Sequence, residues 1–88
     1  MTERLVTIQN RAGVHARPAA LIVQTASKFK SQIFLEKGKD RINGKSIMGI
    51  LAMGASFNTV LKIVAEGEDE EAAATALESL INGRFEGE

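Results

Sequence analysis

Residues 5–20 read LVTIQNRAGVHARPAA, and this stretch predicts a strand, a sharp break and the start of a helix. Leu5-Val6-Thr7-Ile8 is short and rich in residues that favour strands. Asn10 to Gly13 interrupts that pattern, and helix-favouring residues follow from Ala16 to about Lys28. Pro18 suits the first helical turn because its missing N–H would have no intrahelical partner there.

Further along the chain, the sequence predicts a hairpin, a last strand and a last helix. Ile33-Phe34-Leu35 and the weaker Arg41-Ile42-Asn43 flank Lys37-Gly38-Lys39-Asp40, which is typical of a turn between paired strands. Val60 to Glu66 alternates like a strand with one buried face. Glu70 to Asn82 follows as a helix whose acidic first turn suits the helix dipole.

A short apolar helix is predicted between the hairpin and the last strand. Ser46 is a natural N-cap for Ile47 to Met53, and Gly54 can end that helix in a left-handed conformation. Arg84 to Glu88 is expected to be a frayed tail. The apolar stripes expected to face the core are Pro18, Ile22, Ala26 and Phe29 on the first helix, Leu61, Ile63 and Ala65 on the last strand, and Ala73, Leu77, Leu80 and Ile81 on the last helix.

The order of these elements, β-α-β-β-α-β-α, predicts an α+β fold. A parallel sheet would need a helical crossover after every strand, so we expect a four-stranded antiparallel sheet with three helices on one face. This arrangement is an open-faced β-sandwich. The length of 88 residues suits one domain, spanning residues 1–88, and no repeat or linker interrupts it.

Composition excludes several classes of function. Lys and Arg number 11 and Asp and Glu number 11, so the net charge of zero argues against a surface that binds nucleic acid or lipid across the whole domain. The four phenylalanines are too dispersed for a nucleic-acid stacking platform. The chain has no Cys, no signal-peptide pattern and no apolar run near the ~20 residues that cross a bilayer. We expect a cytoplasmic protein without membrane insertion.

The only histidine, His15, lies where the loop turns into the first helix. At that position the amides of Ala16 and Arg17 and the positive end of the helix dipole can receive an anion. A neutral imidazole is a good nucleophile, and its N–P bond is labile enough to pass a phosphoryl group on. The Arg17 guanidinium supplies charge-assisted donors, and Pro18 stiffens the turn. The alternative is that His15 merely caps the helix or makes a surface hydrogen bond.

Three other kinds of site are rejected on sequence grounds. Gly44-Lys45-Ser46 lacks the earlier glycine of a nucleotide-binding P-loop, because Lys39 stands at that position. One histidine and no cysteine leave too few ligands for a zinc centre, so no metal site is expected. Even if Ser46 lies near His15, no recognisable acid orients the imidazole for hydrolysis.

Beyond these physical arguments, Gly13-Val14-His15-Ala16-Arg17-Pro18-Ala19-Ala20 resembles the active-site signature of HPr, the histidine-containing phosphocarriers of the phosphoenolpyruvate-dependent sugar phosphotransferase system. Asn43 to Gly49 resembles the regulatory-serine segment of that family, and Val64 to Glu70 resembles the passage into its last helix. The resemblance runs from Met1 to about Asn82 without an insertion. Two departures are Gly44, where a small aliphatic residue is expected, and a hairpin turn shifted by about one residue.

The resemblance implies a phosphoryl carrier that is not itself an enzyme and needs no cofactor. His15 would take the phosphoryl group from Enzyme I on its Nδ1 atom and pass it to the A domains (EIIA) of sugar permeases, while Arg17 steadies it. In some members a dedicated HPr kinase/phosphorylase modifies the serine that matches Ser46, and the product then acts with a transcription factor in carbon catabolite control. The alternative for Ser46 is an ordinary capping serine. A monomer is expected.

A carrier must present its histidine to several larger proteins, which suits an exposed loop beside a modest apolar patch better than a pocket. The resemblance implies that Ile47, Met48 and Leu51, together with Ala20, form this docking patch. The alternative is that the three apolar side chains of the short helix belong to the core, and at least one of them is expected to be buried. Lys45 would add charge complementarity to acidic partners.

Two functions therefore remain open. The first is a relay that moves phosphoryl groups during sugar uptake. The second is a regulatory module of the same fold, in nitrogen-type phosphotransfer or catabolite control, whose phosphorylation only switches its affinity for partners. The presence of His15 favours the relay.

Overall fold

The computed structural model describes residues 1–87, and the side chains of residues 1–85. Its elements follow the predicted order, and a short fourth helix is added at the end. They are β1 (Thr2–Thr7), α1 (Ala16–Ala26), β2 (Gln32–Lys37), β3 (Asp40–Asn43), α2 (Ile47–Met53), β4 (Val60–Glu66), α3 (Glu70–Asn82) and α4 (Arg84–Gly87).

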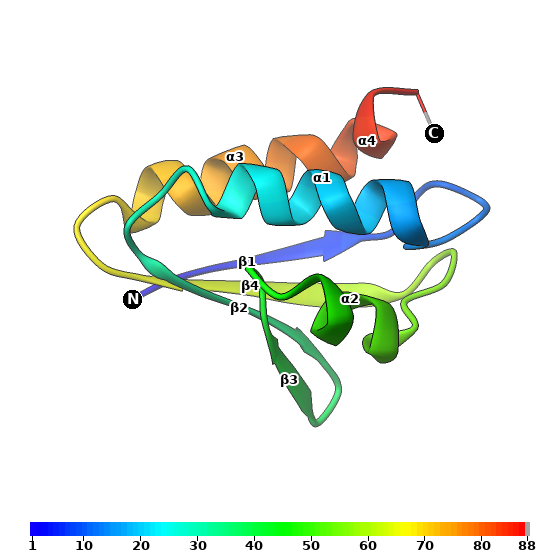
Figure 1. The fold of residues 1–88 in the computed structure, drawn as a ribbon, viewed down its shortest axis with the longest axis horizontal. Helices are drawn as coiled ribbons and strands as arrows, with labels where there is room; N and C mark the ends of the chain where they lie inside the picture. The colour runs from blue at the N-terminus through cyan, green and yellow to red at the C-terminus, as the bar shows by residue number, and fades with distance from the viewer. Residues whose placement is uncertain (88) are drawn as a thin grey trace.

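All pairings in the sheet are antiparallel, and the strand order is β1-β4-β2-β3. The central strand β4 sets Leu61 opposite Val6 of β1, and Ile63 opposite Leu35 of β2. Helices α1 and α3 lie side by side over the sheet, and α2 packs against α1 and β3 (Figure 1). The predicted α+β open-faced sandwich with three main helices is confirmed.

The β2–β3 hairpin turn lies where the sequence predicted it, at Lys37 to Asp40. Lys37 and Asp40 already pair with each other, so only Gly38 and Lys39 form the connection. Gly38 has a φ of +59°, as the first central residue of a type II′ hairpin turn requires. The departure at Gly44 also has a structural reason, because a Cβ there would lie 2.8 Å from the Cγ2 atom of Ile33.

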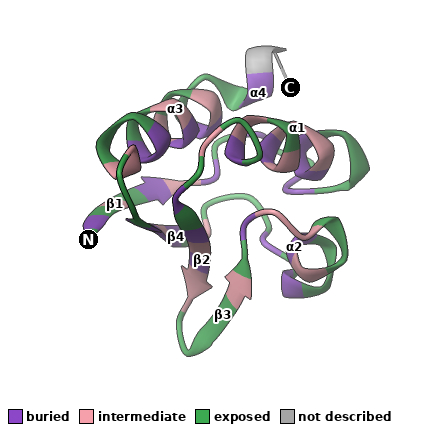
Figure 2. Ribbon diagram, turned by 60° about the vertical axis from the view of Figure 1, so that its left-hand side comes forward, coloured by how far each residue is buried: buried purple, intermediate pink, exposed green. Residues whose placement is uncertain are grey.

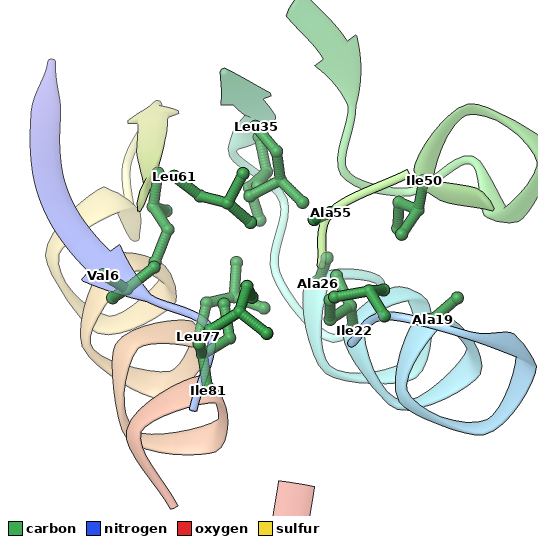
Figure 3. Close-up of a cluster of buried hydrophobic side chains, with 14 of the residues drawn as sticks. Val6, Ala19, Ile22, Ala26, Leu35, Ile50, Ala55, Leu61, Leu77 and Ile81 are labelled. Atoms are coloured by element: carbon green, nitrogen blue, oxygen red, sulfur yellow. The ribbon is translucent and has the colours of Figure 1, made fainter. Parts of the chain in front are cut away.

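The core lies between the sheet and the layer formed by α1 and α3, where buried residues of both layers gather (Figure 2) and their side chains meet (Figure 3). The predicted apolar stripes are buried with two exceptions. Phe29 and Leu80 are half-buried at the edge of the core. The fully buried members of the stripes are Pro18, Ile22 and Ala26 on α1, Leu61, Ile63 and Ala65 on β4, and Ala73, Leu77 and Ile81 on α3.

Two predicted boundaries are wrong. Helix α1 ends at Ala26 rather than near Lys28, because the amide of Lys28 bonds only three residues back, to the carbonyl of Thr25. The tail from Arg84 is not frayed over the described residues, since α4 follows α3 and the Phe85 ring is only 1% exposed. The ring joins the core, which offsets the entropy of ordering the tail. The prediction for Glu88 lies outside the described residues.

The start of α3 is tied to the segment that enters β2. Asp69 accepts hydrogen bonds from the amides of Lys30 and Ser31, both at 2.9 Å, and also from the Ser31 hydroxyl. The Ser31 hydroxyl bond, followed by the bond from the Lys30 amide, lowers the pKa of Asp69 to about 2. This carboxylate therefore links α3 to a distant part of the chain.

Glu70 fixes the N-terminus of the chain against the same end of α3. It accepts hydrogen bonds from the Thr2 hydroxyl at 2.6 Å and the Gly67 amide at 3.1 Å, and it pairs with the Met1 ammonium at 2.9 Å. The Thr2 bond, then the N-terminal ammonium, lowers the pKa of Glu70 to about 2. None of the helices within residues 1–87 has the length and hydrophobicity that a membrane span requires.

Candidate functional site

His15 is exposed and occupies the N-cap position of α1, with φ −104° and ψ −161°. Its carbonyl accepts the first intrahelical bond, from the Ala19 amide at 2.9 Å. The amides of Ala16 and Arg17 precede that bond and have no acceptor within the helix, while Pro18 has no N–H to satisfy. The His15 side chain makes no capping hydrogen bond to α1, so the alternative of a helix-capping imidazole does not apply.

The loop before His15 is pressed against the loop between α2 and β4. The amide of Val14 donates to the carbonyl of Ala55 at 2.8 Å. Gly13 has a φ of +74°, and a Cβ there would lie 2.8 Å from the Ala55 oxygen and 3.0 Å from the Ser56 Cα. Only glycine fits this conformation and this close approach without strain.

Asn10 holds the turn that precedes His15. Its side chain is 1% exposed and donates from Nδ2 to the carbonyl of Gly13 at 2.6 Å, and the Gly13 amide donates back to the Asn10 carbonyl at 3.0 Å. Sequence reasoning treated this segment only as a break between a strand and a helix. The signal that was missed is an asparagine three residues before a glycine, which is typical of side-chain to backbone bonding in turns.

The α2–β4 loop is itself held from two sides. The amide of Ile8 donates to the Thr59 carbonyl at 2.9 Å, and the Asn58 amide donates to the Ile8 carbonyl at 2.8 Å. From the hairpin, the Lys37 ammonium donates to the carbonyl of Met53 at 3.2 Å, at the C-terminal end of α2. The loops at this end of the sheet therefore form one hydrogen-bonded unit (Figure 1).

Ser46 is the N-cap of α2, as predicted, and its hydroxyl accepts a hydrogen bond from the Gly49 amide at 3.1 Å. The predicted left-handed end at Gly54 is also present, with a φ of +66°. Lys45 donates from Nζ to the carbonyl of Phe29 at 2.8 Å, which ties the start of α2 to the segment after α1.

The structure places Ser46 and the His15 loop at opposite ends of α2. Ser46 precedes the helix, whereas Ala55, which contacts Val14, follows it. Seven helical residues span about 10 Å at ~1.5 Å per residue. Ser46 is therefore held apart from the loop by the length of the helix.

The outer face of α2 carries a row of apolar side chains. Ile47, Met48 and Leu51 are 40%, 74% and 38% exposed, so the expectation that at least one of them is buried is wrong. Helix α2 instead turns Ile50 and Met53 toward the core, at 0% and 7% exposure. These two residues are three positions apart and share one side of the helix, which leaves the other three on the surface.

The apolar row lies beside the helix that begins at His15. Helices α1 and α2 pack against each other (Figure 2). Ala20 of α1 is half-buried. Ala16 and Arg17 are exposed on the first turn of α1. Among residues 1–87 no group of His, Cys, Asp and Glu side chains is arranged to hold a metal ion.

The sequence was compared with protein families and with individual relatives. The family model described as "PTS HPr component phosphorylation site" matches residues 2–83. The chain belongs to the HPr family. The phosphocarrier protein HPr of Treponema pallidum is 53% identical over 88 residues, the whole of both chains. The HPr-like protein Crh of Bacillus subtilis is 41% identical over 81 residues, 92% of this chain and 95% of Crh.

Solved structures agree with the family assignment. HPr of Thermoanaerobacter tengcongensis superimposes with a TM-score of 0.96 at 55% identity, covering 100% of this chain and 99% of that one. The same HPr, solved as a dimer, gives a TM-score of 0.79 at 56% identity with both chains covered in full. As a member of the HPr family, the chain is a phosphocarrier protein of the phosphotransferase system and not an enzyme.

Proposed function

We propose that the chain accepts a phosphoryl group from phospho-Enzyme I on His15 and passes it to the A domains of sugar permeases. The observation that carries this proposal is the position of the exposed His15 at the N-terminus of α1, beside two amides that have no acceptor within the helix. A phosphoryl group on the imidazole would meet those amides and the positive end of the helix dipole.

The transfer needs no other protein group to form or break a bond. The Nδ1 lone pair attacks phosphorus, and the N–P bond forms as the bond between phosphorus and the donor breaks. The amides of Ala16 and Arg17 receive phosphoryl oxygens, and the Arg17 guanidinium adds charge-assisted donors. In the second transfer, a group on the permease domain attacks phosphorus, the N–P bond breaks as the new bond forms, and His15 is left unphosphorylated. The carrier is thus regenerated in each cycle.

Docking to these partners is proposed to use the apolar row on α2, with Ala20 of α1 at its border. An exposed methionine, Met48, suits a surface that accepts several partners because its side chain is flexible and polarisable. The neighbouring His15 loop is held to the end of α2, so docking on α2 would also place the imidazole. We further propose that the carrier acts as a cytoplasmic monomer.

A second, regulatory role is proposed for Ser46. As the N-cap of a helix without acidic residues in its first turn, Ser46 can carry a phosphate that interacts favourably with the helix dipole. The added charge would lie beside the apolar docking row and change its affinity for partners. HPr kinase/phosphorylase would supply the phosphate, and a catabolite-control transcription factor would be the partner that responds.

The relative named Crh favours a second candidate function, a purely regulatory module. Crh is described as a catabolite repression HPr. Its solved structures align with 91% to 93% of the length of this chain. In that role the phosphorylation of His15 or Ser46 would switch partner binding without feeding sugar uptake. The relay requires an exposed histidine at a ready anion site, whereas a module regulated through Ser46 alone would not, and His15 therefore favours the relay.

The relay is tested by incubating the purified protein with phosphoenolpyruvate and Enzyme I and reading its intact mass. We expect one added phosphoryl group that is lost in acid and absent from a His15→Ala control. A Ser46→Ala variant should still be labelled. If an Enzyme I that is active on another carrier, and a cognate Enzyme I, both leave the protein unmodified, the relay is excluded and the regulatory module is favoured.

A further inference from the structure

A hollow of about 440 Å³ lies beside the loop that leads to His15. It is open to solvent, and its lining comes from three separate parts of the chain: the β1–α1 loop, the α2–β4 loop and the start of α4. The residues that line it are Gln9, Asn10, Arg11, Ala12, Phe57 and Arg84. We call it the Arg11–Arg84 hollow.

Both charged residues of the hollow are arginines. Arg11 and Arg84 are exposed, and among the described side chains neither has an ion-pair or hydrogen-bond partner. Among the side chains of residues 1–85, none that lines the hollow is acidic. Two guanidinium groups at one site create a local positive potential that an anionic group would relieve.

Acidic residues are also unevenly distributed along the whole chain. The stretches 4–35 and 41–65 contain no Asp or Glu, whereas residues 66–71 contain five acidic residues. That acidic turn joins β4 to α3 at the opposite end of the molecule from the β1–α1 loop (Figure 1). Residues 66–71 therefore concentrate negative charge at one end of the molecule, away from the β1–α1 loop.

The C-terminal turn places Arg84 at the hollow. Arg84 and Phe85 have φ values of +54° and +53°, a conformation that is costly for residues other than glycine. The Phe85 ring is 1% exposed and holds this turn against the core. The guanidinium therefore stands on an anchored backbone rather than on a loose tail.

Phe57 completes the hollow from the α2–β4 loop. Its ring is 46% exposed and offers an apolar surface beside the two guanidinium groups. Arginine and aromatic residues are the types most enriched in the energetic centres of protein interfaces. An open hollow with a mixed polar and apolar lining fits a protein segment better than a small metabolite, because small-molecule sites are mostly enclosed and apolar.

We propose that the Arg11–Arg84 hollow binds an acidic segment of the proteins that exchange the phosphoryl group with His15. A carboxylate of that segment pairs with the two guanidinium groups, and its apolar part packs on Phe57. This inference rests on the proposed relay function and extends its docking surface beyond α2. The hollow and His15 share one loop, so binding there also helps to orient the imidazole toward the partner.

The test compares the kinetics of phosphorylation by Enzyme I for four proteins: the wild type, Arg11→Gln/Arg84→Gln, Phe57→Ala and a control, Lys39→Gln. Lys39 is an exposed cation in the β2–β3 turn, without a described partner. For the double variant we expect the KM for the carrier to rise about 10-fold with kcat unchanged, and the salt dependence of kcat/KM to weaken. Phe57→Ala should raise KM to a smaller extent, and the control should match the wild type.

Each outcome bears on one of the two proposals. If the wild type is phosphorylated on His15 and the double variant, folded by circular dichroism, keeps the wild-type KM, the hollow is not a docking site while the relay stands. If the wild type is not phosphorylated, both proposals fall. A titration with inorganic phosphate tests whether a small anion occupies the hollow instead. Binding is monitored by the NMR chemical shifts of the backbone amides of residues 9–12. Saturable phosphate binding that the double variant loses, combined with unchanged Enzyme I kinetics, would assign a small-anion site and overturn protein docking.

Discussion

Val14 donates its backbone N–H to the carbonyl oxygen of Ala55 at 2.8 Å, and this bond joins the loop that carries His15 to the end of α2. Both residues are buried, at 7% and 3% exposure, so the bond is protected from competing water. The backbone of His15, the proposed phosphoryl acceptor, and the apolar row on α2 are therefore held in a fixed arrangement. A partner that docks on α2 meets an imidazole whose backbone is already in place.

The close contact of Gly13 with Ala55 predicts a large effect of a single methyl group. Gly13→Ala must adopt φ +74° with its Cβ 2.8 Å from the Ala55 oxygen, and we expect it to lower the free energy of unfolding by about 2 kcal/mol or more. Gly38→Ala is the matched control, because Gly38 has φ +59° but open space around it, and it should cost about 1 kcal/mol. Urea unfolding measures both. Equal losses would contradict a steric role for Ala55.

Arg17→Ala is expected to separate function from stability. The guanidinium lies on an exposed first turn and contributes nothing to the core, so the free energy of unfolding should stay within about 0.5 kcal/mol of the wild type. Loss of one charge-assisted donor at the phosphoryl group should slow transfer by about 100-fold. Rapid-quench assays of phosphoryl transfer from Enzyme I measure the rate. An unfolded Arg17→Ala variant would show that the placement of Arg17 is wrong.

The sequence predicts the strands and the two long helices because burial of one face imposes a regular spacing. Leu61, Ile63 and Ala65 alternate along β4, and all three are fully buried. The hairpin turn at Lys37 to Asp40 is likewise predicted. The strand order β1-β4-β2-β3 is not, because it depends on pairing between segments far apart in the sequence.

The missed features of the site depend on contacts between loops far apart in the sequence. Ala55 has no signal of its own, and its carbonyl matters only because Val14 reaches it. The helix spacing of α2 did not identify which apolar side chains face inward, because nearly every position of that helix is apolar. Burial of Phe85, which brings Arg84 to the loop of His15, likewise depends on the assembled core.

Stability at acidic pH should depend on Asp69 and Glu70. The pKa of Asp69 falls from 3.8 to about 2 in the folded protein, so between these values the unfolded chain binds more protons. Its contribution is complete above pH 3.8 and is lost as the pH falls through about 2. The pKa of Glu70 falls from 4.5 to about 2, and this shift contributes to stability over pH in the same direction.

We therefore expect the melting temperature of the wild type to fall steeply between about pH 4.5 and pH 2. Asp69→Asn should be less stable at pH 7 and should show a shallower fall, because only the contribution of Glu70 remains in this window. Asp40→Asn, at an exposed strand end, is the control and should follow the wild-type curve. Parallel curves for the wild type and Asp69→Asn would rule out this role for Asp69.

Ser46 carries a structural role that can be measured apart from its proposed regulation. Ser46→Ala removes the acceptor of the Gly49 amide and should destabilise the protein by about 1 kcal/mol, whereas Ser46→Asp keeps an acceptor and should restore most of the loss. With a competent HPr kinase/phosphorylase and ATP, the wild type should gain one phosphoryl group by intact mass and Ser46→Ala should gain none. An unmodified wild type would leave Ser46 as a capping residue only.

Substitutions on the two faces of α2 should differ strongly in their effect on the free energy of unfolding. Met48 is 74% exposed, so Met48→Ala should change the free energy of unfolding by less than about 0.5 kcal/mol. Ile50 is fully buried, so Ile50→Ala should cost about 2–5 kcal/mol, through lost burial and the cavity left behind. Chemical denaturation of both variants measures this contrast.

If the apolar row docks partners, Met48→Ala should raise the KM for phosphorylation by Enzyme I while the acid-labile labelling of His15 at saturation stays complete. The substitution removes contact area from the interface and leaves the chemistry at the imidazole untouched. Val60→Ala is the matched control, because Val60 is also exposed, at 55%, but belongs to β4 rather than α2. Equal KM values for Met48→Ala and the wild type would remove Met48 from the docking surface. An equal rise in both variants would mean that the effect is not specific to α2.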